Sequence, residues 1–167
     1  MRYNAAMNED IETLQRVYGA LTEKCASLRA ALKAKGLKSE SGFYNNHYRR
    51  NEYGEYVPDA YPIPVISVDG VCDIEVDPRG LGVSSKLSRE AALAYDYASI
   101  PRKFELYGVD DYLRDFYREG MSLKDVASLI EASSESEIGA AFPFGFDDAP
   151  EAVADFIVWL KEREFYY

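Results

Sequence analysis

Residues 65–87 read VISVDGVCDIEVDPRGLGVSSKL, and this stretch decides the fold because two turns separate three segments of strand-forming residues. Asp69-Gly70 supplies the positive backbone angles that a two-residue hairpin turn requires. Apolar and polar residues alternate after this turn, as they do in strands that bury one face. The stretch therefore predicts antiparallel strands at about 65–69, 71–77 and 82–87.

The register between the second and third of these strands follows from matching residue types across the pair. Placing Asp77 opposite Gly82 sets apolar residues against mostly apolar residues on one side. The same alignment places Asp73 opposite Lys86, so that an acid faces a base on the other side. We therefore expect a turn through residues 78–81 and partial neutralisation of the acidic side by Lys86.

A long helix is predicted before these strands, over residues 7–35, and Gly36 is expected to end it. In a parallel dimer of this helix Lys24 would meet Arg29, and the repulsion disfavours that arrangement. We expect the helix to pack on its own domain or antiparallel on a partner. Its apolar residues recur with heptad spacing: Met7, Ile11, Leu14, Tyr18, Leu21, Cys25, Leu28 and Leu32.

The rest of the chain mixes helices and strands. Ser122 with Asp125, and Asp148 with Glu151 ahead of the helix that Pro150 starts, resemble helix caps. This order predicts one α+β domain over residues 1–167, with a mainly antiparallel sheet of about four to six strands. Further strands are predicted at about 43–49, 103–107 and 137–146, and helices at about 88–98, 109–119, 122–133 and 150–164.

Charge is divided unevenly along the chain, whose net charge is −10. Residues 1–58 carry nine basic and seven acidic residues, and residues 59–167 carry ten basic and twenty-two acidic residues. Because phosphate contacts need cations, the acidic body argues against nucleic acid as a partner. No apolar run approaches the roughly 20 residues that cross a bilayer. With two cysteines and no leader-like start, we expect a cytoplasmic protein without membrane contact.

Residues 43–61 read FYNNHYRRNEYGEYVPDAY, and this run is the part of the chain most suggestive of recognition. Tyrosine and arginine combine a large contact area with a polar tip, which is typical of binding surfaces. The tyrosines can instead pack within a hairpin, and the sequence leaves both interpretations open. The candidate binding residues are Tyr44, His47, Tyr48, Arg49, Arg50 and Tyr53.

Asp73, Glu75 and Asp77 form the pattern closest to a catalytic site, because alternate residues of a strand share one face. Carboxylates on a strand hold magnesium in many two-metal nucleases. The match is one tripeptide long, and a solvated strand face partly neutralised by Lys86 is the interpretation that we prefer. No catalytic residue and no cofactor are predicted, although a thiol–imidazole pair of Cys25 or Cys72 with His47 stays an open alternative.

Three further patterns have ordinary explanations. Gly80-Leu81-Gly82 with Lys86 lacks the spacing of a phosphate-binding loop and is expected to form a turn. Asp110-Asp111 and Asp147-Asp148 precede predicted helices, where acids act as caps. The aromatic C-terminus at residues 165–167 either docks in the domain or lies at an interface.

From these observations we expect a non-catalytic protein-binding domain. It would engage a protein partner, or itself, through the tyrosine-rich run, and one version is an inhibitor or immunity-type protein that blocks a basic enzyme. The alternative is a small-ligand-binding domain or an enzyme. That alternative would use His47 and the carboxylates of Asp73, Glu75 and Asp77.

Overall fold

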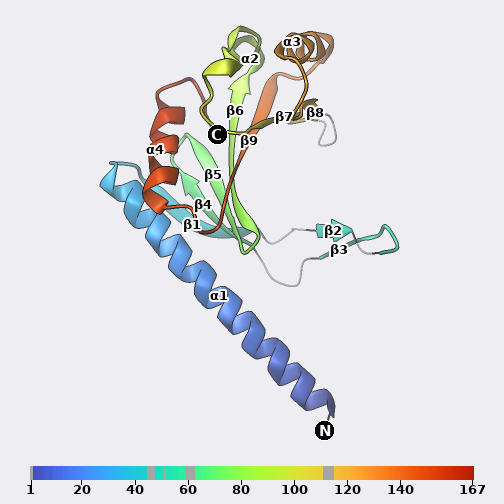
Figure 1. Cartoon of the computed structure of the whole chain (residues 1–167), viewed down its shortest axis with the longest axis vertical. Coiled ribbons are helices and arrows are strands. Elements are labelled where there is room, and N and C mark those ends of the chain that lie inside the picture. The colour runs from blue at the N-terminus through green and yellow to red at the C-terminus, as the bar shows by residue number, and fades with distance from the viewer. Residues whose placement is uncertain (1, 45–47, 51, 59–62, 111–114) are drawn as a thin grey trace.

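The computed structural model describes residues 2–44, 48–50, 52–58, 63–110 and 115–167, without the side chains of residues 2–11, 13, 14, 44, 48–50 and 56–58. It shows an α+β fold in which helices pack on an antiparallel sheet (Figure 1). This confirms the predicted fold class. Among the described residues, no helix combines the length and the apolar character that crossing a membrane requires.

In the described ranges the main sheet has seven strands, in the order β1-β4-β5-β6-β9-β7-β8. Every pair of neighbouring strands in it is antiparallel. The strands are β1 (Ser39–Tyr44), β4 (Ile63–Val68), β5 (Cys72–Asp77), β6 (Gly80–Ser88), β7 (Glu105–Gly108), β8 (Asp115–Tyr117) and β9 (Glu137–Phe144). A separate two-stranded sheet consists of β2 (Tyr48–Arg50) and β3 (Tyr56–Pro58).

The predicted hairpin at Asp69-Gly70 is present, but its turn is not the predicted two-residue turn. Val68 lies opposite Cys72, so the loop holds three residues, and Gly70 has a positive φ of 70° while Asp69 does not. The predicted register of the next pair is wrong by two residues, because Asp77 lies opposite Gly80 rather than Gly82. The Asp77 carboxylate accepts hydrogen bonds from the backbone and guanidinium of Arg79, which closes a two-residue turn. A shift of two residues leaves each side chain on its predicted face.

Helix α1 (Arg2–Ala34) starts five residues earlier than predicted and ends before Gly36, whose φ is 78°. Its second half packs on the sheet, where Leu21, Leu28 and Leu32 are almost completely buried. Figure 1 shows the first half running well beyond the sheet. The heptad seam therefore has its C-terminal part in the core of its own domain.

Helix α4 (Pro150–Lys161) lies beside α1 on the same face of the sheet (Figure 1). Phe142 of β9 meets Phe156 of α4 at a ring-centroid distance of 4.9 Å, so the core lies between this helix and the sheet. The predicted cap at Asp148 is wrong, because the N-cap residue is Ala149 and makes no side-chain cap bond. The Asp148 carboxylate instead accepts the Gly145 N–H at 2.7 Å.

Helices α2 (Arg89–Ala94) and α3 (Leu123–Ala132) lie together at one end of the sheet (Figure 1). Their serine caps are as the sequence suggests, since Ser88 and Ser122 each accept a backbone N–H three residues later. The predicted helix over 88–98 is interrupted after α2. A short 3-10 turn, η1 (Tyr97–Ser99), follows it.

The predicted helix over 109–119 is wrong where the structure describes it, since residues 115–117 form the edge strand β8. Tyr117 pairs with Leu106 of β7, and Phe116 is fully buried in the core. Burial of Phe116 outweighs the helical spacing of the acids in this segment, because tertiary packing overrides local preference. Residues 111–114 lie outside the described residues.

The first strand of the main sheet differs from its predicted bounds. The strand predicted at 43–49 is β1, which begins at Ser39 and ends at Tyr44, while residues 48 and 49 belong to β2.

The C-terminus docks on its own domain. Phe165 is buried, and the backbone of Tyr166 exchanges two hydrogen bonds with Lys86 of β6.

Candidate functional site

The described residues of the tyrosine-rich run divide between the end of β1 and a separate pair of strands, β2 and β3. These two strands and the turn at residues 52–55 are here called the arm. In this arm β2 and β3 pair antiparallel, with Tyr48 opposite Pro58 and Arg50 opposite Tyr56. Figure 1 shows the two strands standing away from the seven-stranded sheet. An isolated two-stranded hairpin is at best marginally stable in water, so an arm of this kind is suited to gaining contacts from another molecule.

Two aromatic side chains in this region are exposed. Tyr53, at the tip of the arm, exposes 78% of its surface, and Phe43, near the end of β1, exposes 58%. The other large apolar side chains exposed in the described part of the chain are Leu123 and Tyr167. The turn that carries Tyr53 is exposed throughout residues 52–55, and Gly54 adopts a φ of 78° there. The arm therefore presents an aromatic tip to solvent.

The structure separates the predicted binding residues into three groups. Tyr48, Arg49 and Arg50 are strand residues of the arm, and Tyr53 lies in its turn. Tyr44 is instead the last residue of β1, opposite Ile63 of the main sheet. His47 lies outside the described residues. The open question about the tyrosines has a clear answer for Tyr53, which is on the surface.

The carboxylates of β5 lie on the sheet face opposite α1 and α4. Asp73, Glu75 and Asp77 are partly exposed and alternate with Cys72, Ile74 and Val76, which are buried against the helices. Each of the three has a different environment. Asp73 is opposite Ser84, Glu75 lies over Gly82 of β6, and Asp77 binds Arg79 at 2.8 Å. The described part of the chain holds no group of three His, Cys, Asp or Glu residues arranged for a metal ion.

The predicted contact between Asp73 and Lys86 is wrong. Lys86 lies opposite Gly139 of β9 because of the two-residue shift in register. Its ammonium group is 3.7 Å from the Glu137 carboxylate and 5.0 Å from the centre of the Tyr167 ring. Lys86 therefore interacts with β9 and the docked C-terminus rather than with β5.

A groove of about 880 Å³ runs between the end of α1 and the β4–β5 turn. It was not found from the sequence, because its walls come from segments that are far apart along the chain. Its lining includes Arg29 and Lys33 of α1 together with Asp69 and Asp73, so the lining is of mixed charge. Arg29 is held in place by hydrogen bonds to the hydroxyl and carbonyl oxygens of Ser39.

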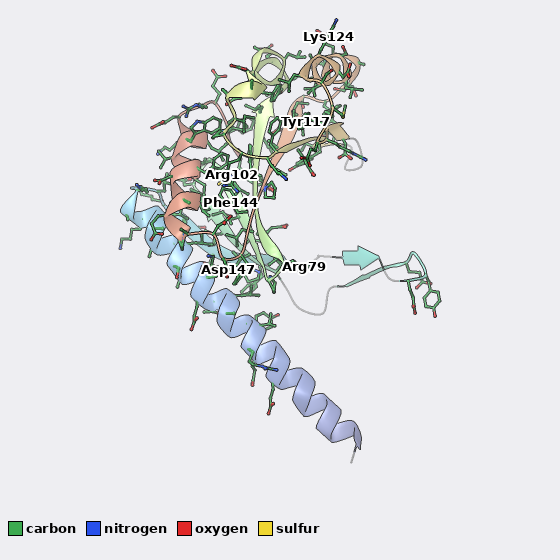
Figure 2. All side chains as sticks on the ribbon, viewed as in Figure 1. Arg79, Arg102, Tyr117, Lys124, Phe144 and Asp147 are labelled. Atoms are coloured by element: carbon green, nitrogen blue, oxygen red, sulfur yellow. The ribbon has the colours of Figure 1, made fainter. Side chains whose placement is uncertain are left out.

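A second hollow of about 470 Å³ lies beside the start of β7. Phe104 and Tyr117 stack in it at a centroid distance of 4.5 Å, and the Arg102 guanidinium covers the Phe144 ring at 3.5 Å. Figure 2 shows Arg102, Phe144 and Tyr117 on this part of the molecule. The sequence prediction missed this cluster because it treated Tyr117 as part of a helix.

The surroundings of the two thiols disfavour the thiolate form. Cys72 is fully buried, and this burial raises the pKa of its thiol far above the usual range, so the reactive thiolate is disfavoured. Burial also raises the pKa of the half-buried Cys25. Since His47 lies outside the described residues, a contact between either thiol and its imidazole stays a prediction.

Two of the four paired aspartates have a described role in local structure. The backbone N–H of Asp110 donates to the Glu135 carboxylate at 2.9 Å, and the residues that follow it, 111–114, lie outside the described residues. Asp148 closes the turn before α4 through Gly145. Gly80-Leu81-Gly82 belongs to β6, so this segment continues the strand instead of forming the expected turn.

Comparison with known proteins gives a fold relationship and no function. No family model matches the chain, and no curated protein matches it. A conserved hypothetical protein from Pyrococcus furiosus has a similar solved structure, with a TM-score of 0.65 and 25% sequence identity. The likeness covers 93% of this chain and 95% of that protein. It supports the α+β fold described above.

Proposed function

We propose that this chain is a non-catalytic protein-binding domain that engages a protein partner through the β2–β3 arm. The observation that supports this most is the exposure of Tyr53 at the tip of a hairpin standing off the sheet. With 78% of its surface exposed, this aromatic side chain has a large area available for contact with another molecule.

The composition of the arm fits this role. Tyrosine and arginine are the residues most enriched at binding hot spots, and the arm carries both within residues 48–56. Tyrosine also loses little conformational entropy when it is covered, because it has two rotatable side-chain bonds. Phe43, in β1, is a second exposed aromatic side chain next to the segment that leads into the arm.

The negative charge of residues 59–167, here called the body, favours rapid association with positively charged partners. Residues 59–167 carry twelve more acidic than basic residues, whereas residues 36–58 carry three of each. A basic partner would be attracted by the body and contacted by the near-neutral arm, because complementary fields raise association rates. An inhibitor or immunity-type protein that blocks a basic enzyme is the version of this proposal that uses both features.

Replacing Tyr53 with serine tests the proposal. We expect Tyr53→Ser to leave the melting temperature unchanged and to weaken the partner complex at least tenfold, about 1.4 kcal/mol. The matched control is Leu123→Ser, which removes another exposed apolar side chain on α3. Wild type and both variants are immobilised, and the proteins that each retains from a lysate of the source organism are compared. The affinity of each of the three for the retained partner is then measured by titration.

Two results would count against the arm. Equal retention of the partner by wild type and Tyr53→Ser would show that the tip does not contribute. A clear drop in melting temperature for Tyr53→Ser would show that this ring stabilises the fold instead. The alternative function, a ligand domain or enzyme that uses Asp73, Glu75 and Asp77, stays a prediction from the sequence.

A further inference from the structure

The first half of α1 is a helix that its own domain does not cover. The helix runs for 33 residues, about 50 Å at 1.5 Å per residue. Arg16, Val17, Ala20 and Leu21 line a hollow with Pro78 and Phe146, which marks the lower edge of the body. Figure 1 shows the helix before this point extending away from the sheet and from the other helices.

A helix of this length needs support that its sequence does not provide. Residues 2–15 form about four turns, and isolated helices of about 12–15 residues are marginal in water even when they are rich in alanine. The first turn holds no acidic residue to favour the helix dipole, and Gly19 further weakens the helix. Most helical stability in proteins comes from packing of an apolar face, so a covering surface is expected here.

The apolar seam continues into this uncovered half. Leu21, Leu28 and Leu32 bury their part of the seam in the body, while Tyr18 is still partly exposed. The same heptad spacing then continues toward the N-terminus through Leu14, Ile11 and Met7. The seam therefore passes from a part covered by the sheet to a part that has the pattern for covering a second helix.

We propose that α1 packs antiparallel on α1 of a second copy of the chain. In the register that matches the seams, Ile11 of one copy lies opposite Leu14 of the other, and Met7 lies opposite Tyr18. Asn4 falls opposite Leu21, where the sheet begins to cover the seam. The apolar layers thus end where the body begins. The two bodies lie at opposite ends of the paired helices and do not compete for space.

Charge favours this orientation and this part of the chain. A parallel pair places Lys24 beside Arg29, whereas the antiparallel pair sets Asp10 beside Val17 and Asn8 beside Gln15. Residues 2–20 carry two basic and three acidic residues, so they are nearly neutral. Two chains of net charge −10 repel each other least when they approach through such a segment.

The hollow at the lower edge of the body gives the second helix room. Its volume is about 290 Å³, and Val17, Leu21 and Phe146 contribute to its lining. In the proposed register Tyr3 of the second copy lies on the same flank of the helix pair as Val17. In this register the N-terminal end of the second α1 reaches the hollow. Its side chains would cover the apolar residues that line it.

Light scattering over a concentration series tests the pairing. We expect wild type to shift from monomer to dimer between the low-micromolar and millimolar range, and added salt to strengthen the dimer by screening the acidic bodies. Ile11→Glu with Leu14→Glu should leave a monomer whose melting temperature matches that of monomeric wild type. The control Thr13→Glu adds a charge on the outer side of the heptad and should still dimerise.

A monomeric wild type at every concentration, or a double variant that still dimerises, would overturn the proposal. Orientation is measured with a spin label on Glu23→Cys in a Cys25→Ala background, since Cys72 is fully buried. The antiparallel register separates the two labels by 21 residues, about 30 Å along the axis, whereas a parallel pair brings them side by side. Short label distances would exclude the antiparallel arrangement. Tyr53→Ser should leave the dimer unchanged, which separates this result from the function of the arm.

Discussion

Replacing Phe142 with alanine is expected to lower the free energy of unfolding by about 3–5 kcal/mol, the usual range for a buried phenylalanine. Phe142 is fully buried on β9. Its ring makes edge contacts with Phe156 at 4.9 Å and with Phe165 at 5.8 Å, so it joins the sheet, α4 and the docked C-terminus. Such aromatic pairs add about 0.5–1.5 kcal/mol beyond the area they bury.

Denaturation by urea, followed by fluorescence, measures this loss. Trp159 is the single tryptophan of the chain and stacks on Phe156 at 5.5 Å, so its emission reports on the same core. The matched control is Phe43→Ala, which removes the same ring from a position that is 58% exposed. We expect that control to stay within about 0.5 kcal/mol of wild type. Equal effects of the two variants would contradict the described core.

Arg89→Met is expected to lower the free energy of unfolding by about 2–3 kcal/mol, because the arginine attaches α2 to the end of α3. Its guanidinium donates to the carbonyl oxygen of Glu131 at 2.8 Å and to the carbonyl oxygen of Ser133. These carbonyls end a helix, where a positive charge is favoured by the dipole. Methionine keeps the apolar stem but leaves both acceptors without this donor.

Arg79→Met is the control for the loss of arginine hydrogen bonds at the surface. Arg79 also makes two guanidinium bonds, to the Asp77 carboxylate, but its side chain is 77% exposed. Exposed ion pairs contribute about 0–1 kcal/mol, so this variant should stay close to wild type. Chemical denaturation of both variants compares them directly. A larger loss for Arg79→Met than for Arg89→Met would contradict the role of Arg89 at α3.

Local signals in the sequence predicted much of the fold. The β4–β5 hairpin follows from Asp69-Gly70 and alternation, and α3 follows from the cap at Ser122. The register of β5 and β6 did not follow, because a shift of two residues keeps every side chain on the same face. In the observed alignment Asp77 lies opposite Gly80, and its bonds to Arg79 close the two-residue turn.

Long-range packing explains what the sequence could not predict. The acids in residues 110–119 have helical spacing, yet Phe116 is drawn into the core as part of an edge strand. The groove beside Arg29 is lined by residues from 29–40 and 67–73 and by Tyr167, so no local motif marks it. The arm was found by its composition, but only the fold shows that its two strands pair separately from the main sheet.

The central claim is that the tip of the arm contacts a protein partner, and crosslinking from that tip tests it most directly. A photoreactive amino acid replaces Tyr53 in one variant and Leu123 in the other, and both are irradiated in cells of the source organism. From position 53 we expect one discrete crosslinked product that contains this chain and one other protein. From position 123 we expect no product of the same mass. No crosslinked product from position 53, or the same products from both positions, would contradict the claim.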